Sequence, residues 1–281
     1  QILGDGTGDV CHLWERECSV QRQRQKIVEI APAPNLPPSV RERILGAALN
    51  LAEAVRYRNA GTVEFLLDAS REGDDAPFAF IETNARLQVE HTVTEEVTGL
   101  DIVRLQLEIA GGRTLAELGL GRDRVPTPRG TAIQLPAGPS VRVDGYGYPG
   151  YRTNPRFDSL LAKVIVHAAG DGAHGGLERA AAKAYRALSE FRIAGAPTNA
   201  PFLQNVLRDP DFLAGRVHTG FIEERPALIA TDPAAHQRLY FEPPASTRPI
   251  RWPCWPTART AVPTWWPRRC RPPTTPRRRP T

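Results

Sequence analysis

The chain has 281 residues, a net charge of +5, four cysteines and no methionine. This length is enough for two modest domains. No apolar run approaches the roughly 20 residues of a membrane span, and the cysteines show neither metal-ligand spacing nor a dense disulfide framework. We therefore expect a protein of the reducing cytoplasm that has no membrane partner.

The positive charge comes from the C-terminal segment. Pro243–Thr281 contains eleven Pro, nine Arg, four Trp and no acidic residue, so subtracting its nine charges from +5 leaves −4 for residues 1–242. Arg with interleaved Trp can contact phosphates and stack on bases. So many prolines leave little scope for helix or sheet, and we predict a disordered basic tail with no nucleic-acid partner.

The rest of the chain has alternating and helical patterns that predict an α+β fold. Strands are predicted at Val10–Glu15, Ile27–Ile30, Thr62–Leu67, Phe78–Thr83, Ser140–Val143 and Ala162–His167. Among the helices, a capping box at Ser39–Glu42 predicts the start of one whose apolar stripe runs from Ile44 to Val55. Thr92–Glu95 is predicted to cap another, Gly99–Ile109 to hold two short helices or a broken one, and Leu177–Phe191 to form a further helix.

The most informative segment is Phe80–Val93, in which polar residues recur at every second position. They are Glu82, Asn84, Arg86, Gln88 and Glu90. In an extended strand one face would carry all five, with neighbours on that face roughly 7 Å apart. The alternative is an ordinary amphipathic strand with one wet face, but such faces usually carry Lys, Thr and Ser. We therefore predict a site that holds a metal ion at one end and an anion at the other.

A second β-rich run, Gly61–Asp68, precedes this segment and carries Glu64. The Asp- and Gly-rich stretch Ala69–Ala76 is predicted to join the two runs as a long hairpin, which would bring Glu64 close to Glu82 and Asn84. Two carboxylates and an amide oxygen suit Mg²⁺ or Mn²⁺, which prefer hard oxygen ligands. Paired carboxylates repel each other without a cation, so this pairing favours a metal site.

Seven segments occur in the order of a known family. They are Glu15–Lys26, similar to E-R-D-C-S-x-Q-R-R-H-Q-K; Glu29–Pro34; Glu82–His91, similar to E-x-N-x-R-x-Q-V-E-H; Gly138–Asp144; Tyr148–Tyr151; Phe157–Lys163; and Glu190–Gly195. Together they resemble the biotin carboxylase component of biotin-dependent carboxylases such as the acetyl-CoA, propionyl-CoA and pyruvate enzymes. The resemblance extends over about residues 1–225.

This resemblance implies a domain organisation. Residues 1–120 correspond to the C-terminal half of an ATP-grasp domain, 121–226 to a biotin carboxylase C-terminal domain, and 227–281 to a linker and tail. The family's N-terminal half, with most of the groups that hold ATP, would precede the start of this chain. The family also has additional residues after Leu135, so we expect an internal deletion there, and it usually has His where this chain has Arg24.

The resemblance also assigns chemistry. The family uses ATP to activate bicarbonate as carboxyphosphate, and then carboxylates biotin that a carrier protein presents. The residues implied for ATP are Gln21, Glu64 and Glu82, and those for Mg²⁺ or Mn²⁺ are Glu64, Glu82 and Asn84. The residues implied for bicarbonate are Arg86, Gln88, Val89 and Lys26.

Two further residues receive catalytic roles from the resemblance. Glu90 corresponds to the general base that deprotonates bicarbonate, and we expect Arg86 and Lys26 to keep it ionised. Arg142 corresponds to the residue that stabilises the biotin enolate. The expected catalytic set is therefore Glu90, Arg86, Arg142 and Lys26.

Simpler interpretations remain open for these residues. Glu64 or Glu82 alone would be an ordinary strand carboxylate, and Arg86 with Glu90 a structural ion pair. Arg142 alone would be a surface strand residue, and Lys26 part of a solvated basic face.

At the level of the whole chain, we expect an ATP-dependent biotin carboxylase segment. Its partners would be a biotin carboxyl carrier domain and a carboxyltransferase subunit, and the resemblance also makes a homodimer one of its expected forms. The alternative from another class is a catalytically inactive remnant that docks a carrier or a subunit. Carbamoyl-phosphate synthetase, which also makes carboxyphosphate on an ATP-grasp fold, is an enzymatic rival that Gln88–His91 and the Arg142 segment argue against.

Overall fold

A computed structural model of the chain describes residues 1–68, 70–71, 73–135, 142–145, 147, 150–152, 160–169, 175–230 and 232–239. The predicted deletion after Leu135, residues 157–159 of the Phe157–Lys163 motif, and the tail with its predicted disorder lie outside these residues. Residues Gln1–Tyr240 form one compact unit. In the described part, no helix is both long and apolar enough to cross a membrane.

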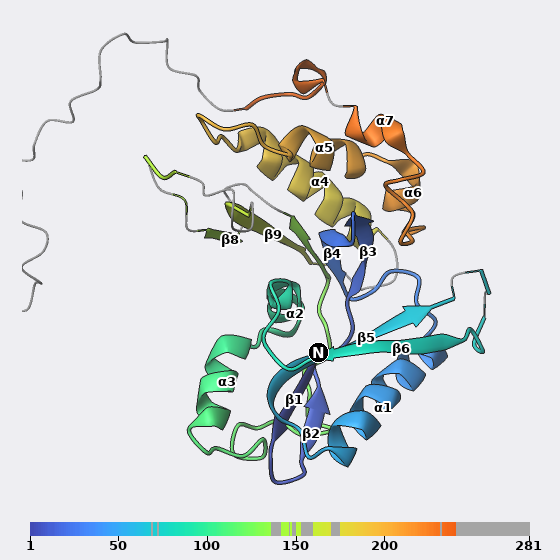
Figure 1. Cartoon of the computed structure of the whole chain (residues 1–281), viewed down its shortest axis with the longest axis vertical. Coiled ribbons are helices and arrows are strands. Elements are labelled where there is room, and N and C mark those ends of the chain that lie inside the picture. The colour runs from blue at the N-terminus through green and yellow to red at the C-terminus, as the bar shows by residue number, and fades with distance from the viewer. Residues whose placement is uncertain are drawn as a thin grey trace, which may run out of the picture. The chain divides into compact units, whose positions relative to one another are not determined.

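The first sheet has four antiparallel strands in the order β2-β1-β5-β6. They are β1 (Ile2–Asp5), β2 (Val10–His12), β5 (Arg58–Leu67) and β6 (Phe78–Asn84). Alternation in β1 sends Ile2 into the cluster formed with α1 (Pro38–Ala54) and Leu3 into the cluster formed with α3 (Ile102–Ala110). The two helices therefore cover opposite faces of this sheet (Figure 1).

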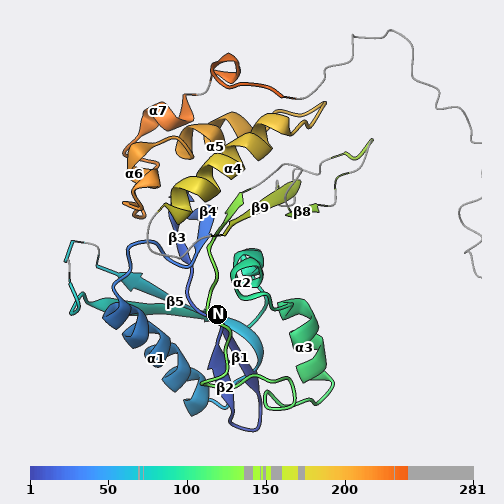
Figure 2. The same ribbon diagram turned by 180° about the vertical axis from the view of Figure 1, so that it is seen from behind.

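The second sheet has five antiparallel strands in the order β3-β4-β7-β9-β8. They are β3 (Glu17–Arg22), β4 (Gln25–Ala31), β7 (Thr131–Leu135), β9 (Ala162–Ala168) and β8 (Arg142–Gly145). Helix α2 (His91–Thr98) packs on one face and α4 (Gly176–Glu190) on the other (Figure 2). Strands from both sides of residue 120 thus share this sheet, and the predicted domain division at that point stays a prediction.

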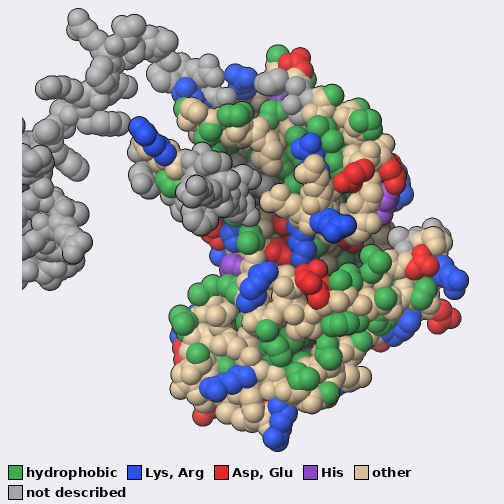
Figure 3. All heavy atoms as spheres, in the orientation of Figure 1, with side chains coloured by type: hydrophobic (Ala, Val, Ile, Leu, Met, Phe, Trp, Pro, Cys, Tyr) green, Lys and Arg blue, Asp and Glu red, His purple; other side chains and the backbone are tan. Residues whose placement is uncertain are grey.

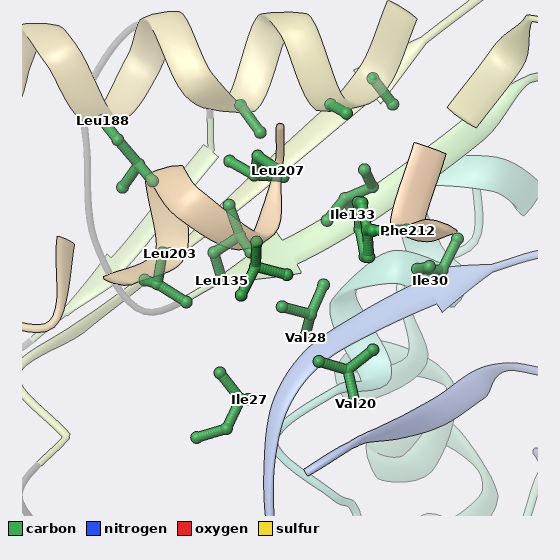
Figure 4. Packing of buried hydrophobic residues seen from close by; sticks show 14 of the residues in the cluster. Val20, Ile27, Val28, Ile30, Ile133, Leu135, Leu188, Leu203, Leu207 and Phe212 are labelled. Carbon is green, nitrogen blue, oxygen red and sulfur yellow. The ribbon is translucent and has the colours of Figure 1, made fainter. Parts of the chain in front are cut away.

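The largest core lies between this sheet and α4. Apolar side chains of β3, β4 and β7, such as Val20, Val28 and Ile133, meet Leu188 of α4 and Phe212 (Figure 4). Short helices complete this layer: α5 (Ala200–Val206), α6 (Pro210–Leu213), α7 (Pro226–Ile229) and the 3₁₀ turn Pro233–Ala235. Removal of apolar surface from water on both faces holds the sheet in place relative to α2 and α4.

The α+β prediction is confirmed, and most expected elements are present. The segment Gly99–Ile109 holds the single helix α3, which begins at Ile102, so the prediction of two short helices or a broken one there is wrong. Helix α4 buries Ala181, Ala184 and Leu188 as predicted. Of the predicted strand Ser140–Val143, only Arg142 and Val143 are described, and both lie in β8. Strands β3 and β7 were not predicted, because each is short and polar residues interrupt its apolar pattern.

Both predicted helix caps are wrong. Helix α1 already begins at Pro38, since proline at the first helical position presets φ and needs no hydrogen-bond partner for its nitrogen. Ser39 lies inside the helix and donates its hydroxyl to Asp74 at 2.6 Å. Helix α2 begins at His91, so Thr92 also lies inside it and donates its hydroxyl to Gln134 of β7.

The apolar stripe predicted on α1 is also partly wrong. Leu45, Ala48 and Ala52 are buried, but Val55 lies beyond the helix and is 62% exposed.

Candidate functional site

The site begins with the β5–β6 hairpin, which has the predicted form. Glu64 is the cross-strand partner of Glu82, and Thr62 is the partner of Asn84. The Asn84 amide donates from Nδ2 to Glu64 Oε1 at 3.1 Å and to Glu82 Oε1 at 2.7 Å. Paired positions share a face of the sheet. The hairpin therefore presents two carboxylates and one amide side by side.

The predicted continuous strand from Glu82 to Glu90 is wrong in its second half. Strand β6 ends at Asn84, so the strand alternation does not continue to Glu90. Residues 85–90 form a loop that leads into α2. The loop turns Gln88 and Glu90 inward, to 6% and 5% exposure. Backbone geometry, not strand periodicity, thus brings these polar groups together.

Lys26 of β4 connects the hairpin to this loop. Its Nζ lies 2.9 Å from Glu64 Oε1 and 2.6 Å from Glu90 Oε1. Although burial opposes the charged form, the acidic groups around Lys26, including Glu90 and Glu64, raise its pKa. Gln88 donates from Nε2 to the same Glu64 oxygen at 2.8 Å. Three donors from three segments therefore converge on Glu64 Oε1.

Glu90 is held in its ionised form, but by only one of the two cations that we expected. Burial on its own would raise the pKa of Glu90, yet the positive charges of Arg16 and Lys26 outweigh this effect and lower it. Arg86 instead donates to the carbonyl of Leu87 at 3.2 Å and is exposed. The expectation that Arg86 keeps Glu90 ionised is therefore wrong. Arg16, which lies in the Glu15–Lys26 segment, has this effect instead.

A cavity of about 620 Å³ joins these groups. Nine of the ten predicted site residues line it: Gln21, Lys26, Glu64, Glu82, Asn84, Arg86, Gln88, Val89 and Glu90. In the space-filling view, a recess with acidic and basic side chains separates the part that carries α4 and α5 from the part that carries the first sheet (Figure 3). A second cavity of about 730 Å³ shares Gln21, Lys26, Glu64, Gln88 and Glu90 with the first.

Arg142 is the predicted site residue that does not line the first cavity. It is the cross-strand partner of Ile165, whose side chain packs with Val93 and Val97 of α2. Arg142 therefore faces α2, where its Nη1 lies 2.6 Å from Glu95 Oε2. Its Nε lies 3.3 Å from Asp144.

Comparison with known proteins agrees with this architecture. A family model described as the carbamoyl-phosphate synthase L chain, ATP binding domain, matches residues 1–118, and the biotin carboxylase C-terminal domain matches residues 124–224. Pyruvate carboxylase 1 of Caenorhabditis elegans is 47% identical over 261 residues, covering 84% of this chain and 21% of the relative. Human mitochondrial pyruvate carboxylase is 45% identical over 261 residues, covering 84% of this chain and 21% of the relative.

Solved structures give the same result. The biotin carboxylase domain of a single-chain bacterial carboxylase matches with a TM-score of 0.74 and 45% identity, covering 81% of this chain and 55% of that one. The chain belongs to the biotin carboxylase family. A second match is the biotin carboxylase domain dimer of Hydrogenobacter thermophilus 2-oxoglutarate carboxylase, in complex with MgADP, ADP and bicarbonate. Its TM-score is 0.73 and its sequence identity 35%, and the match covers 82% of this chain and 53% of that one. The chain spans about a fifth of the curated relatives it matches and about half of these biotin carboxylase domains.

The donor set of the hairpin fits the divalent cation that the biotin carboxylase resemblance implies. Glu64 and Glu82 supply hard carboxylate oxygens on one face, beside the Asn84 amide. No group of three or more His, Cys, Asp or Glu in the described part could hold a metal alone. Two carboxylates without a full protein cage suit Mg²⁺, which usually shares its coordination sphere with phosphate and water.

The sequence analysis assigned no role to three charged residues around this candidate site, although all three lie in the motifs quoted above. Arg16 was part of a quoted motif but received no role. Glu29 of β4 lines the cavity opposite its strand partner Gln134, which donates to it at 3.2 Å. Burial, and then the charge of Glu90, raise the pKa of Glu29 to about 8.

Lys163 is the third of these residues. It lies in β9, lines the cavity and donates to the Val89 carbonyl at 2.7 Å. Glu29 and Lys163 each lie at one end of a quoted motif, which was the available signal, but only the pairing of distant strands shows that they line the cavity.

Proposed function

We propose that this chain takes part in the ATP- and bicarbonate-dependent carboxylation of biotin through carboxyphosphate, as part of a biotin carboxylase domain. The observation that carries the proposal is the contact of Lys26 with both Glu90 and Glu64 in one cavity. This contact joins a buried, ionised carboxylate to the acidic pair of the hairpin. A base and a cation-binding pair then lie on the same wall.

Glu90 is proposed as the general base for bicarbonate. A base must be ionised before it can accept a proton, and the charges of Arg16 and Lys26 keep Glu90 in that form. Gln88 and Lys26 would bind the anion together with Arg86 and the backbone of Val89, all of which line the cavity. A divalent cation bound at Glu64, Glu82 and Asn84 would neutralise phosphate charge during phosphoryl transfer.

The second cavity is the proposed place for part of the nucleotide. It is lined by Leu66 and Ile81, which are 53% exposed each, and it reaches Gln21 and Glu64. An apolar wall beside an acidic pair suits a planar base attached to a metal-bound phosphate chain. This arrangement supports the proposed ATP contacts of Gln21 and Glu64, while the proposed contact of Glu82 rests on its pairing with Glu64.

Arg142 is proposed to stabilise the biotin enolate only after it exchanges partners. Its guanidinium now pairs with Glu95, whose side chain is 7% exposed. To reach an enolate in the cavity, Arg142 would have to leave this contact. The role therefore requires the Arg142 side chain to change conformation and release Glu95.

Partners are proposed by analogy with the relatives. The curated relatives are pyruvate carboxylases, so we propose a carrier domain, a carboxyltransferase that delivers the carboxyl group to pyruvate, and pairing of two biotin carboxylase domains. A cytoplasmic location stays a prediction.

A non-catalytic carrier- or subunit-docking module is the second candidate. The pairing of Arg142 with Glu95 favours it, because this contact holds the expected biotin-side cation outside the cavity. Calorimetry separates the two functions. Binding of Mg-ATP supports the carboxylase, whereas binding of a biotinylated carrier domain without nucleotide binding supports the docking module.

The direct test is carboxylation of free biotin, measured as ATP- and bicarbonate-dependent incorporation of labelled carbon. We expect Glu90→Gln to lower the rate by about 10²-fold or more, because general bases contribute roughly that much. Glu42→Gln, on the exposed side of α1, is the matched control and should stay within about twofold. Where the chain alone is inactive, an ATP-grasp N-terminal half is supplied with it. Equal rates for Glu90→Gln and the control would refute the proposal.

A further inference from the structure

The segment between β2 and β3 places one cation at the junction of four parts of the fold. Arg16 donates from Nη1 to Gln1 Oε1 and Thr94 Oγ1, both at 3.0 Å. From Nη2 it donates to Thr62 Oγ1 and Gln88 Oε1, both at 3.2 Å. These acceptors belong to the start of the chain, α2, β5 and the loop that precedes α2. All four of these residues are buried.

The contact with Gln88 determines which way its amide points. A guanidinium has only donors, so the side of Gln88 that faces Arg16 must be the carbonyl oxygen. A carboxylate has only acceptors when ionised, so the side that faces Glu64 must be the NH₂ group, which donates to it at 2.8 Å. Amide orientation is ambiguous when both neighbours are neutral, but here two charges of opposite sign dictate it.

We propose that Arg16 is a positioning residue of the anion pocket, which holds the amide of Gln88 with its NH₂ group toward the cavity wall that carries Glu64 and Glu90. This inference rests on the proposed function, because it concerns the same bicarbonate site. An anion is bound by N–H donors and repelled by carbonyl oxygens. A flipped Gln88 would therefore present the wrong atom.

The charge of Arg16 acts in the same direction. None of the ion pairs among the described residues includes Arg16, since its four partners are neutral oxygens. Its field is therefore not cancelled by a direct carboxylate contact, and it reaches the base. Together with Lys26, it lowers the pKa of Glu90.

Two other titratable groups surround that base. They are Glu29, whose pKa is raised by burial and then by the charge of Glu90, and Cys18 of β3, whose pKa burial raises. Arg16 and Lys26 thus supply the positive charges near Glu90, and only Lys26 touches it. Removal of Arg16 should loosen Gln88 and raise the pKa of Glu90 together.

The test uses the whole chain and does not require turnover. Arg16→Met and Arg16→Lys are compared with Arg41→Met, a matched control whose guanidinium contacts Glu15 and the Ala33 carbonyl instead. The readouts are the side-chain NH₂ resonances of Gln88, the pKa of Glu90 followed by ¹³C-carboxyl NMR, and the affinity for ¹³C-bicarbonate. Assignments come from Gln88→Glu and Glu90→Gln.

We expect Arg16→Met to shift the Gln88 resonances, to raise the pKa of Glu90 by about one unit, and to weaken bicarbonate binding about tenfold. Arg16→Lys keeps the charge but lacks the planar fork, so it should restore the Glu90 pKa and leave the Gln88 resonances shifted. This variant also tests the proposal if Arg16→Met fails to fold. The proposal would be overturned if the Gln88 resonances stayed where they are in Arg41→Met and the bicarbonate affinity stayed within twofold of that control.

A failure of the proposed function gives a different result. In that case the unaltered chain would not bind bicarbonate at all, while the Gln88 resonances would still report on its orientation. Shifted resonances in Arg16→Met and Arg16→Lys would then support the positioning role alone. Unshifted resonances would refute it.

Discussion

The β5–β6 hairpin and strand β8 both carry residues of the family motifs, but the fold uses them differently. Glu64, Glu82 and Asn84 on the hairpin meet one another and line the cavity. Arg142 on β8 meets Glu95 of α2. The hairpin strands pair directly with each other, whereas the face of Arg142 depends on β9 and α2. Motif order therefore predicts placement only where local pairing determines it.

The largest expected effect tests the cavity side of this comparison. Lys26→Met would leave Glu64 and the buried Glu90 without their shared cation, so we expect a loss of about 3 kcal/mol in unfolding free energy. Bicarbonate affinity should fall about 100-fold. Denaturant unfolding and bicarbonate titration measure the two effects.

The matched control for this change is Lys183→Met. Lys183 is exposed on α4 and donates to the His167 carbonyl, far from any carboxylate pair of the site. It should change stability by less than about 0.5 kcal/mol. A similar loss in both variants would show that Lys26 is only a surface lysine.

The second effect concerns the metal. Glu64→Gln and Glu82→Gln each remove one hard oxygen charge from the paired positions, so each should weaken Mg²⁺-dependent ADP binding about tenfold. Calorimetry with and without Mg²⁺ measures this. If both variants bind Mg-ADP like the unaltered chain, the hairpin carboxylates are structural.

The third effect is on pH dependence and follows from Glu29. Its pKa is about 8 in the folded chain against 4.5 ordinarily, so between these values the folded state keeps a proton that the unfolded state releases. Stability of the unaltered chain therefore falls as pH rises through this window. The Glu29→Gln variant should become more stable than the unaltered chain, by roughly 2 kcal/mol of unfolding free energy, as the pH rises from about 5 to about 8. Parallel stability curves would contradict this expectation.

The smallest effect tests the β8 side. Arg142→Gln should reduce stability by about 1 kcal/mol, because Glu95 is buried and loses its charged partner. Bicarbonate affinity should stay within about twofold, since Arg142 does not line the cavity. A tenfold loss of affinity with unchanged stability would instead place Arg142 in the anion site and remove the contrast with the hairpin.

These contrasts show which parts of the site were predictable. The pairing of Glu64 with Glu82 was predicted because a hairpin is local and its register follows from the two strand patterns. The strand to Glu90 was predicted wrongly, because side-chain alternation cannot reveal where a strand ends. Arg16 and Glu29 lie in quoted motifs but received no role, because their partners lie in segments that are far away in sequence.

The sequence by itself determined the family, the α+β class and the set of polar residues on the hairpin and loop, since long ordered motifs and local periodicity are written in neighbouring residues. Only the tertiary structure decided that Lys26 joins Glu64 to Glu90, that Arg16 orients Gln88, and that Arg142 faces Glu95. The physical reason is that each of these contacts crosses between elements. Their geometry depends on how the two sheets and α2 bury their apolar faces, and no single segment encodes it.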